Sequence, residues 1–204
     1  MEGTHVSMGL RHHRLTTIAA VTAAALLVLA VARVSIAAGP PYPDPIPGIH
    51  VYDTADALTG ADIGAAEKQI QAIEARTGAQ IVVYTQVKPE SDTPEAAEAD
   101  AAALGTQWGV GRKGFDDGLV ILFDLEPNLC HGQVQLYAAK GFAAAFLSNS
   151  DRQRIYEDTM LPDLRACRLG AALAGALEQV DQAATPEHAA NLERARQIDA
   201  VLGL

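Results

Sequence analysis

Residues 108–125, WGVGRKGFDDGLVILFDL, contain the only tryptophan of the chain, several glycines, two adjacent aspartates and a long apolar run. The glycines allow the backbone to turn at positions where a Cβ atom would clash. Residues 119–123 are apolar without alternation, which predicts a strand buried on both faces of a sheet. Asp116 and Asp117 come just before that strand. The stretch is therefore either a polar turn leading into a core strand or the position of a functional site.

The sequence around this stretch switches between helical and strand patterns. Thr59 and Asp62 have the spacing of a capping box at the start of a helix, and Gly78 is suited to the end of that helix. The other expected strands and helices are strands over 79–87 and 133–139, and helices over 94–108, from Ser150 to a break near Pro162, over 169–180 and over 186–204. This order predicts an α/β fold, a three-layer α/β/α sandwich with helices on both faces of the sheet.

The N-terminal segment has the features of a membrane anchor. Residues 15–32 are apolar apart from three threonines, and a basic stretch at residues 1–14 precedes them. This pattern predicts a membrane helix within residues 15–38 whose N-terminus lies in the cytoplasm. The small residues at 35–38 also fit a signal cleavage site, which would release the chain as a secreted protein. Both alternatives place the rest of the chain on the extracytoplasmic side of the cell membrane.

Beyond this segment, composition divides the chain into three parts. Five prolines fall within residues 40–48, so we expect residues 39–48 to form a stiff, extended linker that holds the globular part away from the bilayer. Residues 49–182 are expected to form the globular domain. Residues 183–204 are amphipathic and highly charged, which predicts a separate C-terminal helix.

The charge of the chain restricts its partners. The formal net charge is −10, made up of +2 in the first 38 residues and −12 in the remainder. A domain this acidic repels phosphate backbones, so we expect no nucleic-acid partner. The same charge is compatible with a divalent cation.

The two cysteines, Cys130 and Cys167, are the only ones in the chain. An even pair outside the cytoplasm is more often a disulfide than two free thiols, and the ends of the elements that carry them could meet in a three-layer fold. A catalytic pair of Cys130 with His131 is poor in geometry, because adjacent residues of an extended chain point to opposite sides. We therefore expect a Cys130–Cys167 disulfide.

Four blocks of the sequence together resemble the TPM domain family, which includes a thylakoid phosphatase and related bacterial proteins with one membrane segment. The blocks are VYDTADAL at 51–58, TGAQIVVYT at 77–85, WGVGRKGFDDGLVIL at 108–122 and AAKGF at 138–142. The resemblance extends over about residues 49 to 180. It implies a short, mixed, twisted sheet between helix layers on the extracytoplasmic side of a membrane. It also implies calcium binding, which has been described for family members, and acid phosphatase activity, which has been described for the plant member.

The resemblance also implies a site. It places the acidic residues of the family on Asp53, Asp116 and Asp117, which we expect to be ligands of Ca²⁺ or another divalent cation, since such ions take carboxylate and carbonyl oxygens. Asp56 could complete the site if the first block lies beside the start of the central strand. The glutamate that often follows the later glycine motif of the family is missing from residues 141–145. Without a cation, Asp116 and Asp117 would form an ordinary turn.

Other residues near this stretch have two interpretations each. Trp108 is either part of a ligand pocket or, as the end of an apolar helical stripe, part of the core. Arg112 and Lys113 either hold a substrate phosphate or are solvated loop charges. Asp124 lies roughly 20 Å along the strand from Asp117, so it is not expected to share a cation with it.

Two functions are compatible with these features. The first is a membrane-tethered, extracytoplasmic, non-catalytic module that binds protein partners and holds a cation, with Asp117 favoured over Asp116 as ligand. The second is a weak metal-assisted acid phosphatase acting on phosphomonoesters. The sequence has no P-loop, HExxH or GxSxG motif and shows no nucleophile, and whether the chain is an enzyme stays open.

Overall fold

The computed structural model describes residues 38–202. The predicted basic N-terminus at 1–14 and the predicted membrane or signal segment at 15–38, apart from Ala38, lie outside these residues. Within residues 38–202, no helix combines the length and the apolar character needed to cross a bilayer.

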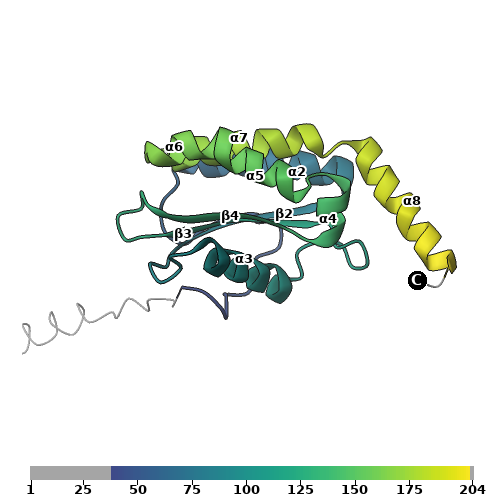
Figure 1. The fold of residues 1–204 in the computed structure, drawn as a ribbon, viewed down its shortest axis with the longest axis horizontal. Coiled ribbons are helices and arrows are strands. Elements are labelled where there is room, and N and C mark those ends of the chain that lie inside the picture. Colours follow the sequence, from purple (N-terminus) through teal and green to yellow (C-terminus); the bar gives the residue numbers. More distant parts are fainter. Residues whose placement is uncertain (1–37, 203–204) are drawn as a thin grey trace, which may run out of the picture. The chain divides into compact units, whose positions relative to one another are not determined.

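A four-stranded mixed sheet forms the centre of the domain (Figure 1). Its order is β1 (Val51–Asp53), β2 (Gln80–Val87), β3 (Gly118–Leu125) and β4 (Gly132–Ala138). The first three strands are parallel, and β4 runs antiparallel to β3 because a hairpin joins them. The carboxyl ends of β1, β2 and β3 therefore share one end of the sheet, and their amino ends share the other.

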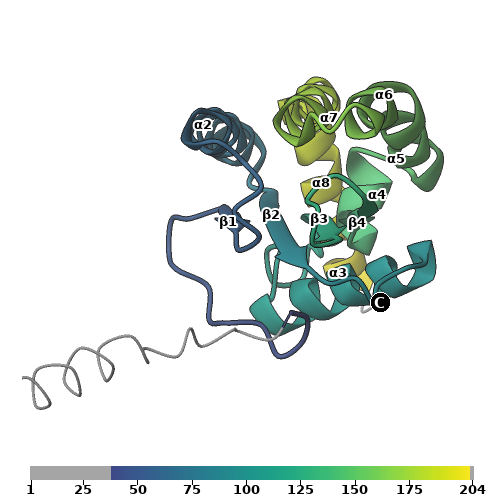
Figure 2. The ribbon, with the colours of Figure 1, turned by 90° about the vertical axis from the view of Figure 1, so that its left-hand side faces the viewer.

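Helices cover both faces of this sheet. Their bounds are α2 (Gly60–Thr77), α3 (Pro94–Trp108), α4 (Lys140–Ala145), α5 (Asn149–Arg154), the π-helical turn η1 (Ile155–Met160), α6 (Leu161–Arg165), α7 (Leu169–Ala183) and α8 (Pro186–Leu202). Helix α3 lies on one face, and α2, α5, α6 and α7 form a layer over the other (Figures 1 and 2). The predicted α/β fold, a mixed sheet with helices on both faces, is confirmed.

Strand β3 is the centre of the core. All eight of its residues are buried, since strands lie on both sides of it and helices cover both faces. Leu119, Ile121 and Phe123 belong to the cluster shared with α2 and α7. Val120 and Leu122 pack in the cluster under α3. The prediction of a strand buried on both faces is confirmed, and each such side chain contributes roughly 1.5–3 kcal/mol by leaving water.

The ends of α2 follow the predicted signals. The hydroxyl of Thr59 accepts a hydrogen bond from the backbone of Asp62, whose carboxylate accepts one in return from the backbone of Thr59. Gly78 ends the helix with a φ of +74°, in the left-handed region that favours glycine.

The next helical region differs from the prediction. Ser148 caps α5 through a capping box with Asp151, so the predicted cap at Ser150 is wrong. The predicted break near Pro162 is also wrong, because the chain stays helical from α5 through η1 into α6. Pro162 lies in the first turn of α6, just after the π-helical turn, where its missing N–H group is tolerated.

Residues 39–48, here named the proline strap, pack on the domain. Tyr42 is only 4% exposed. Its backbone N–H donates to the side chain of Gln107, which donates back to its carbonyl. The Trp108 indole N–H donates to the carbonyl of Pro43 at 2.9 Å. Residues 39–48 contain no helix or strand, and all of them except Gly39 and Tyr42 are exposed. A proline-rich chain has no internal hydrogen bonds, and free backbone groups of Tyr42 and Pro43 pair here with side chains of α3, a contact that the sequence did not predict.

The predicted disulfide is present between Cys130 and Cys167, whose Cα atoms lie 4.8 Å apart. Cys130 lies in the hairpin loop between β3 and β4, and Cys167 follows α6. The bond ties this loop to the helical layer above the sheet.

Candidate functional site

The predicted acidic pair lies in a glycine-rich turn, residues 109–117, at the amino end of β3. The Asp117 side chain is 0% exposed. One of its carboxylate oxygens accepts a hydrogen bond from the backbone N–H of Arg112 at 2.7 Å. The other accepts from the Arg112 Nε at 2.8 Å and lies 2.7 Å from its Nη2. Both oxygens of Asp117 are thus bound by one arginine of the same turn.

Arg112 is itself fixed by its surroundings. Its guanidinium lies 4.2 Å from the centre of the Phe115 ring, a cation–π contact. Its Nη1 lies 3.3 Å from a carboxylate oxygen of Glu193 in α8. Arg112 is therefore not a freely solvated loop charge, because it is the internal partner of Asp117.

Asp116 differs from its neighbour, because its side chain is 61% exposed. The carboxylate lies 3.5 Å from the guanidinium of Arg196 in α8. The backbone carbonyl of Asp116 accepts from the N–H groups of Gly141 and Phe142 at the start of α4. A Cβ atom on Gly141 would lie 1.8 Å from the carbonyl oxygen of Phe115, so only glycine permits this contact. The turn and α4 are therefore locked together through backbone atoms.

Asp53 lies at the opposite end of the sheet. In the register of the strands, Asp53 pairs with Thr85, and Thr85 pairs with Phe123. Asp117 precedes β3 by one residue, six positions from Phe123, which corresponds to roughly 20 Å along a strand. Asp53 therefore shares no cation with Asp116 and Asp117, and the predicted three-ligand site is corrected on this point. Among residues 38–202, no group of three His, Cys, Asp or Glu side chains is arranged to hold a metal ion.

The Asp53 carboxylate has a structural role in its own turn. It accepts hydrogen bonds from the backbone N–H groups of Ala57 and Leu58 and from the hydroxyl of Thr85. Asp56, in the same turn, has a φ of +56° and does not approach the start of β3. Trp108 is partly buried and packs against Tyr52 and Tyr84, with ring centres 4.5 and 5.8 Å away, at the edge of the core cluster under α3. It also lines a surface cavity of about 220 Å³, so it has features of both interpretations.

A surface cavity of about 530 Å³ lies beside the glycine-rich turn. Its lining includes the basic side chains of Arg112, Lys113 and Lys140, together with Asp116. Of the predicted metal ligands, Asp116 is the one that reaches this cavity.

The carboxyl end of the sheet holds a polar cluster that was not predicted from the sequence as a site. Asp124 is 1% exposed and accepts a hydrogen bond from the side-chain amide of Gln86 at 2.6 Å. Behind it, Lys88 forms an ion pair with the nearly buried Asp100 of α3. The second carboxylate oxygen of Asp124 and the hydroxyl of the buried Ser91 have no well-formed hydrogen bond among the described residues. In the sequence, the one signal of this cluster was Asp124, a charged residue within the otherwise apolar residues 119–125.

The environment of Asp124 changes its protonation. Burial, and to a smaller extent the nearby Asp100, raise its pKa from 3.8 to about 6, whereas hydrogen bonds from Ser91 and Gln86 oppose the rise. Burial also raises the pKa of the Tyr42 hydroxyl well above its usual value, and the charges of Asp100 and Asp124 add to this effect.

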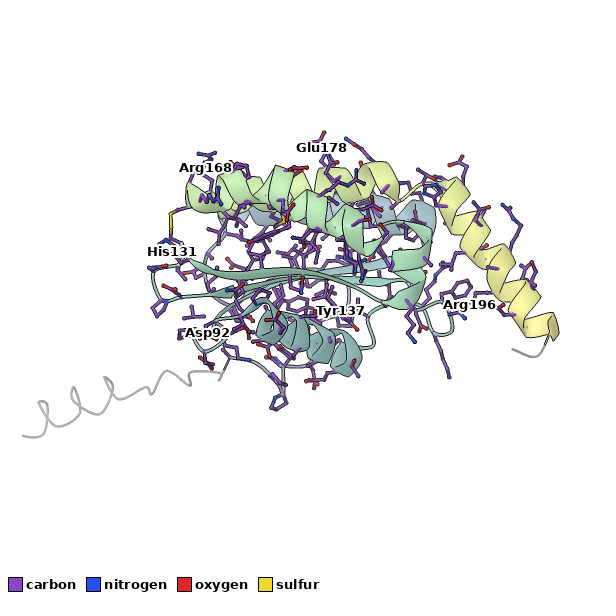
Figure 3. All side chains as sticks on the ribbon, in the orientation of Figure 1. Asp92, His131, Tyr137, Arg168, Glu178 and Arg196 are labelled. Carbon is purple, nitrogen blue, oxygen red and sulfur yellow. A yellow bond between two sulfur atoms is a disulfide. The ribbon has the colours of Figure 1, made fainter. Side chains whose placement is uncertain are left out.

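A second cavity, of about 310 Å³, opens next to this cluster and is here named the carboxyl-end pocket. Asp124 and Ser91 line it, with the loop after β2 on one side and the β3–β4 hairpin and α6 on the others. Figure 3 shows two further lining residues, Asp92 and His131, at the end of the sheet that carries the disulfide, with Arg196 at the opposite end. The two cavities are therefore separate sites.

Comparison with known proteins gives a family and two matching solved structures. The TPM domain family profile matches residues 51–183, from β1 to the end of α7. The solution NMR structure of the N-terminal domain of a protein from P. gingivalis shares 25% identity, with a TM-score of 0.55 over 65% of this chain and 80% of that chain. The N-terminal domain of the cg2496 protein from Corynebacterium glutamicum shares 15% identity, with a TM-score of 0.49 over 74% of this chain and 87% of that chain. None of the curated proteins compared with the chain matches it.

Proposed function

Since the chain belongs to the TPM domain family, we propose that it is a membrane-tethered, extracytoplasmic module that binds protein partners and does not catalyse a reaction. The observation that carries the non-catalytic part of this proposal is the pairing of Asp117 with Arg112. Both carboxylate oxygens of Asp117 are bound, and its side chain is 0% exposed.

A metal-assisted hydrolase needs carboxylates that can hold an ion or accept a proton from water. The Asp53 carboxylate is likewise committed, to backbone N–H groups and the hydroxyl of Thr85. Releasing Asp117 from Arg112 would leave a buried charge without its partner, which costs several kcal/mol. The predicted acidic residues therefore favour a structural role over a catalytic one.

The location outside the cytoplasm is supported by two independent features. Residues 15–32 have the apolar composition of a membrane helix, with basic residues before them. The Cys130–Cys167 disulfide is of a kind that persists in oxidising compartments and is rare in the cytosol.

A cation, if one binds the glycine-rich turn, would use Asp116. Its carboxylate is exposed, and Ca²⁺ would take its remaining oxygens from backbone carbonyls and water. The ion would compete with Arg196, which now lies 3.5 Å from that carboxylate. We therefore propose Asp116, not Asp117, as the main side-chain ligand.

The second candidate function is a weak metal-assisted acid phosphatase. It is favoured by the cavity beside the turn, where Lys113 and Lys140 lie in the same lining as Asp116. Two ammonium groups could hold a phosphate while a cation on Asp116 polarised it.

One experiment separates the two functions. The full chain, in lipid nanodiscs, is assayed with p-nitrophenyl phosphate with and without Ca²⁺ or Mg²⁺, alongside Asp116→Asn. We expect no turnover above the buffer rate. Metal-dependent turnover that Asp116→Asn abolishes would establish the phosphatase and overturn our first proposal. In the same samples, a rise in melting temperature with Ca²⁺ that is lost in Asp116→Asn would support the cation site.

Partner binding is tested on the exposed face of α8, whose Ile198 is 59% exposed. A photoreactive residue at position 198 of the full chain in native membranes is expected to cross-link to one discrete protein. Cross-linking to lipid alone would count against a protein-binding role for this helix.

A further inference from the structure

The outer strand β4 is an open edge of the sheet. It pairs with β3, and no strand lies beyond it among residues 38–202. Its sequence, GQVQLYA, has none of the charged residues or prolines that usually protect such an edge from pairing with another chain. The other edge strand, β1, has only three residues, and the carboxylate of Glu67 binds the N–H group of Val51 there. The sheet is therefore protected at β1 and open at β4.

The hydrogen-bond pattern shows which backbone groups of β4 face outward. The N–H group of Ala139, next to the end of the strand, donates to the carbonyl of Gly118 in β3. Bonded residues alternate along an antiparallel pair, so every second residue before Ala139 also bonds to β3. Val134 and Leu136 lie between these residues and turn their N–H and C=O groups away from β3. Among the described residues, no backbone group outside the sheet bonds to either of them.

A groove runs along this open edge. A cavity of about 320 Å³ is lined by five consecutive residues of β4, 133–137, and by side chains of both helical layers. Pro94 and Glu98 of α3 stand on one side, and Arg152 of α5 and Tyr156 of η1 stand on the other. Because the sheet separates the two layers, a cavity that reaches both lies beyond its edge, where α3 and α5 flank β4 (Figure 2). This cavity is here named the β4 groove.

We infer that the β4 groove binds an extended peptide segment of a partner protein, which adds a strand to the sheet and places an acidic side chain against Arg152. In strand addition of this kind, main-chain hydrogen bonds supply affinity and alternate side chains supply specificity. The inference rests on the proposed role as a protein-binding module and names a surface for that role.

Arg152 gives the groove its charge preference. The guanidinium donates to the carbonyl of Leu147 at 2.7 Å and to the side chain of Asn149 at 2.6 Å, and neither partner is charged. The adjacent Asp151 forms its ion pair with Arg154 instead. Burial lowers the pKa of Arg152, because the charged form has lost part of its hydration. A peptide carboxylate would supply the missing counter-charge, and its hydrogen bonds would be stronger than those to neutral acceptors.

The opposite wall adds a second preference. Glu98 of α3 lies in the same lining, and its side chain is exposed. Neighbouring residues of an extended chain point to opposite sides, so a residue next to the acidic one would face Glu98. A basic residue fits there. It also makes the acid–base pair neutral, which suits a domain whose net charge after residue 38 is −12.

A second copy of this chain fits the groove less well than a single segment. An added strand lies only about 4.8 Å from the strand with which it pairs. Two β4 strands at that distance would bring the α3 and α5 helices of both copies into the same space, because these helices flank the edge. Two copies would also repel each other through their equal net negative charges.

The test is an NMR titration of the ²H,¹⁵N-labelled full chain in nanodiscs with the acetylated and amidated peptide Thr-Val-Thr-Glu-Lys-Val-Thr. In the free chain, the amides of Val134 and Leu136 should exchange with solvent faster than those of Gln133 and Gln135, which bond to β3. With the peptide we expect saturable shifts along residues 133–137 and slower exchange at Val134 and Leu136. The same peptide N-methylated at its Glu and Lys residues, which blocks both edges of the added strand, should not bind.

Replacing the peptide Glu by Gln should weaken binding about tenfold, because the charge-assisted bonds to Arg152 are lost. Arg152→Gln should weaken binding of the Glu peptide to the same extent and abolish its preference over the Gln peptide. Arg154→Gln is the matched control, since it removes the same charge from the same helix outside the lining of the groove. It should leave binding unchanged. The N-methylated peptide tests strand addition on the parent chain, so a failure of Arg152→Gln to fold does not protect the inference.

The inference is overturned if no saturable shifts occur at β4, if the N-methylated peptide binds as tightly as its parent, or if Arg152→Gln keeps the preference for Glu. Slower exchange at Val134 and Leu136 that increases with protein concentration, without peptide, would identify a second copy as the occupant and would also overturn it. A discrete cross-linked protein at position 198 with no peptide binding at β4 would refute the groove and leave the proposed function standing. Metal-dependent phosphatase turnover with peptide binding at β4 would refute the non-catalytic role and leave the groove standing.

Discussion

The substitution Asp124→Asn should stabilise the protein at neutral pH, and the gain should depend on pH. Asp124 is 1% exposed, and its pKa is raised from 3.8 to about 6, chiefly by burial and then by the neighbouring Asp100. Below about pH 3.8 the carboxyl is protonated in both the folded and unfolded chains. Between about pH 3.8 and 6 the folded chain retains a proton that the unfolded chain releases, so stability falls as pH rises. At about 1.4 kcal/mol for each tenfold change in an acid constant, the full loss above pH 6 is roughly 3 kcal/mol.

An asparagine at position 124 does not ionise, and its carbonyl oxygen can still accept from the Gln86 amide. We therefore expect the difference in unfolding free energy between Asp124→Asn and the parent chain to be small near pH 4 and to rise to about 2–3 kcal/mol at pH 7. Urea unfolding followed by circular dichroism between pH 4 and 7.5 measures this difference. Asp116→Asn, at an exposed carboxylate, should change stability by no more than about 0.5 kcal/mol across the range. If the difference for Asp124→Asn stays constant with pH, or if the variant is less stable than the parent chain at pH 7, the argument that burial of the Asp124 carboxylate raises its pKa and lowers stability is refuted.

Three further predictions concern stability. Arg112→Ala should lower the free energy of unfolding in urea by about 3–5 kcal/mol, because it leaves the buried Asp117 charge unpaired. Adding Asp117→Asn should restore part of that loss. Equal losses in the single and double variants would contradict the pairing. Reduction of the disulfide should lower the free energy of unfolding by roughly 4 kcal/mol, because the bond closes a loop with a sequence separation of 37. An unchanged urea midpoint in reductant would show that the bond does not constrain the unfolded chain. Tyr42→Ala should lower the free energy of unfolding by about 3 kcal/mol, because this side chain of the proline strap is part of the core. Ile46→Ala, at a 60% exposed position of the same strap, should have almost no effect. Similar small effects at both positions would mean that the strap is a free linker.

The fold could be predicted largely from local patterns. The apolar run marks β3, and the capping box at Thr59 and Asp62 and the glycine at position 78 mark the two ends of α2; both elements lie where the sequence predicted them. The proline strap could not be predicted in this way. Its proline content indicates an extended chain, but only the tertiary structure shows that Tyr42 is buried.

The site was harder to predict than the fold, because the sheet has two ends and the sequence does not show which residues share one. Asp53 and Asp117 are both near strand ends in the sequence, but Asp53 is the last residue of β1 whereas Asp117 precedes β3. In parallel strands these positions lie at opposite ends of the sheet. The pairing of Asp117 with Arg112 depends on the conformation of a glycine-rich turn, which no periodicity describes.

The two ends of the sheet also differ in which segment outside the family match packs against them. The family match ends before α8 and begins after the proline strap. At the amino end, Glu193 and Arg196 of α8 form ion pairs with Arg112 and Asp116 of the glycine-rich turn, so this helix is held against the turn by opposite charges. At the carboxyl end, Gly39 and Tyr42 of the strap extend the network around Asp124, since the Gly39 N–H donates to Gln86 and the Tyr42 hydroxyl donates to the backbone of Asp100. The strap itself donates no hydrogen bond to the Asp124 carboxylate, which the side-chain amide of Gln86 contacts. The amino end is thus closed by ion pairs from α8, and a ligand there would have to displace arginines that are already in place, whereas the carboxyl end is closed by hydrogen bonds from the strap to Gln86 and to the backbone of Asp100.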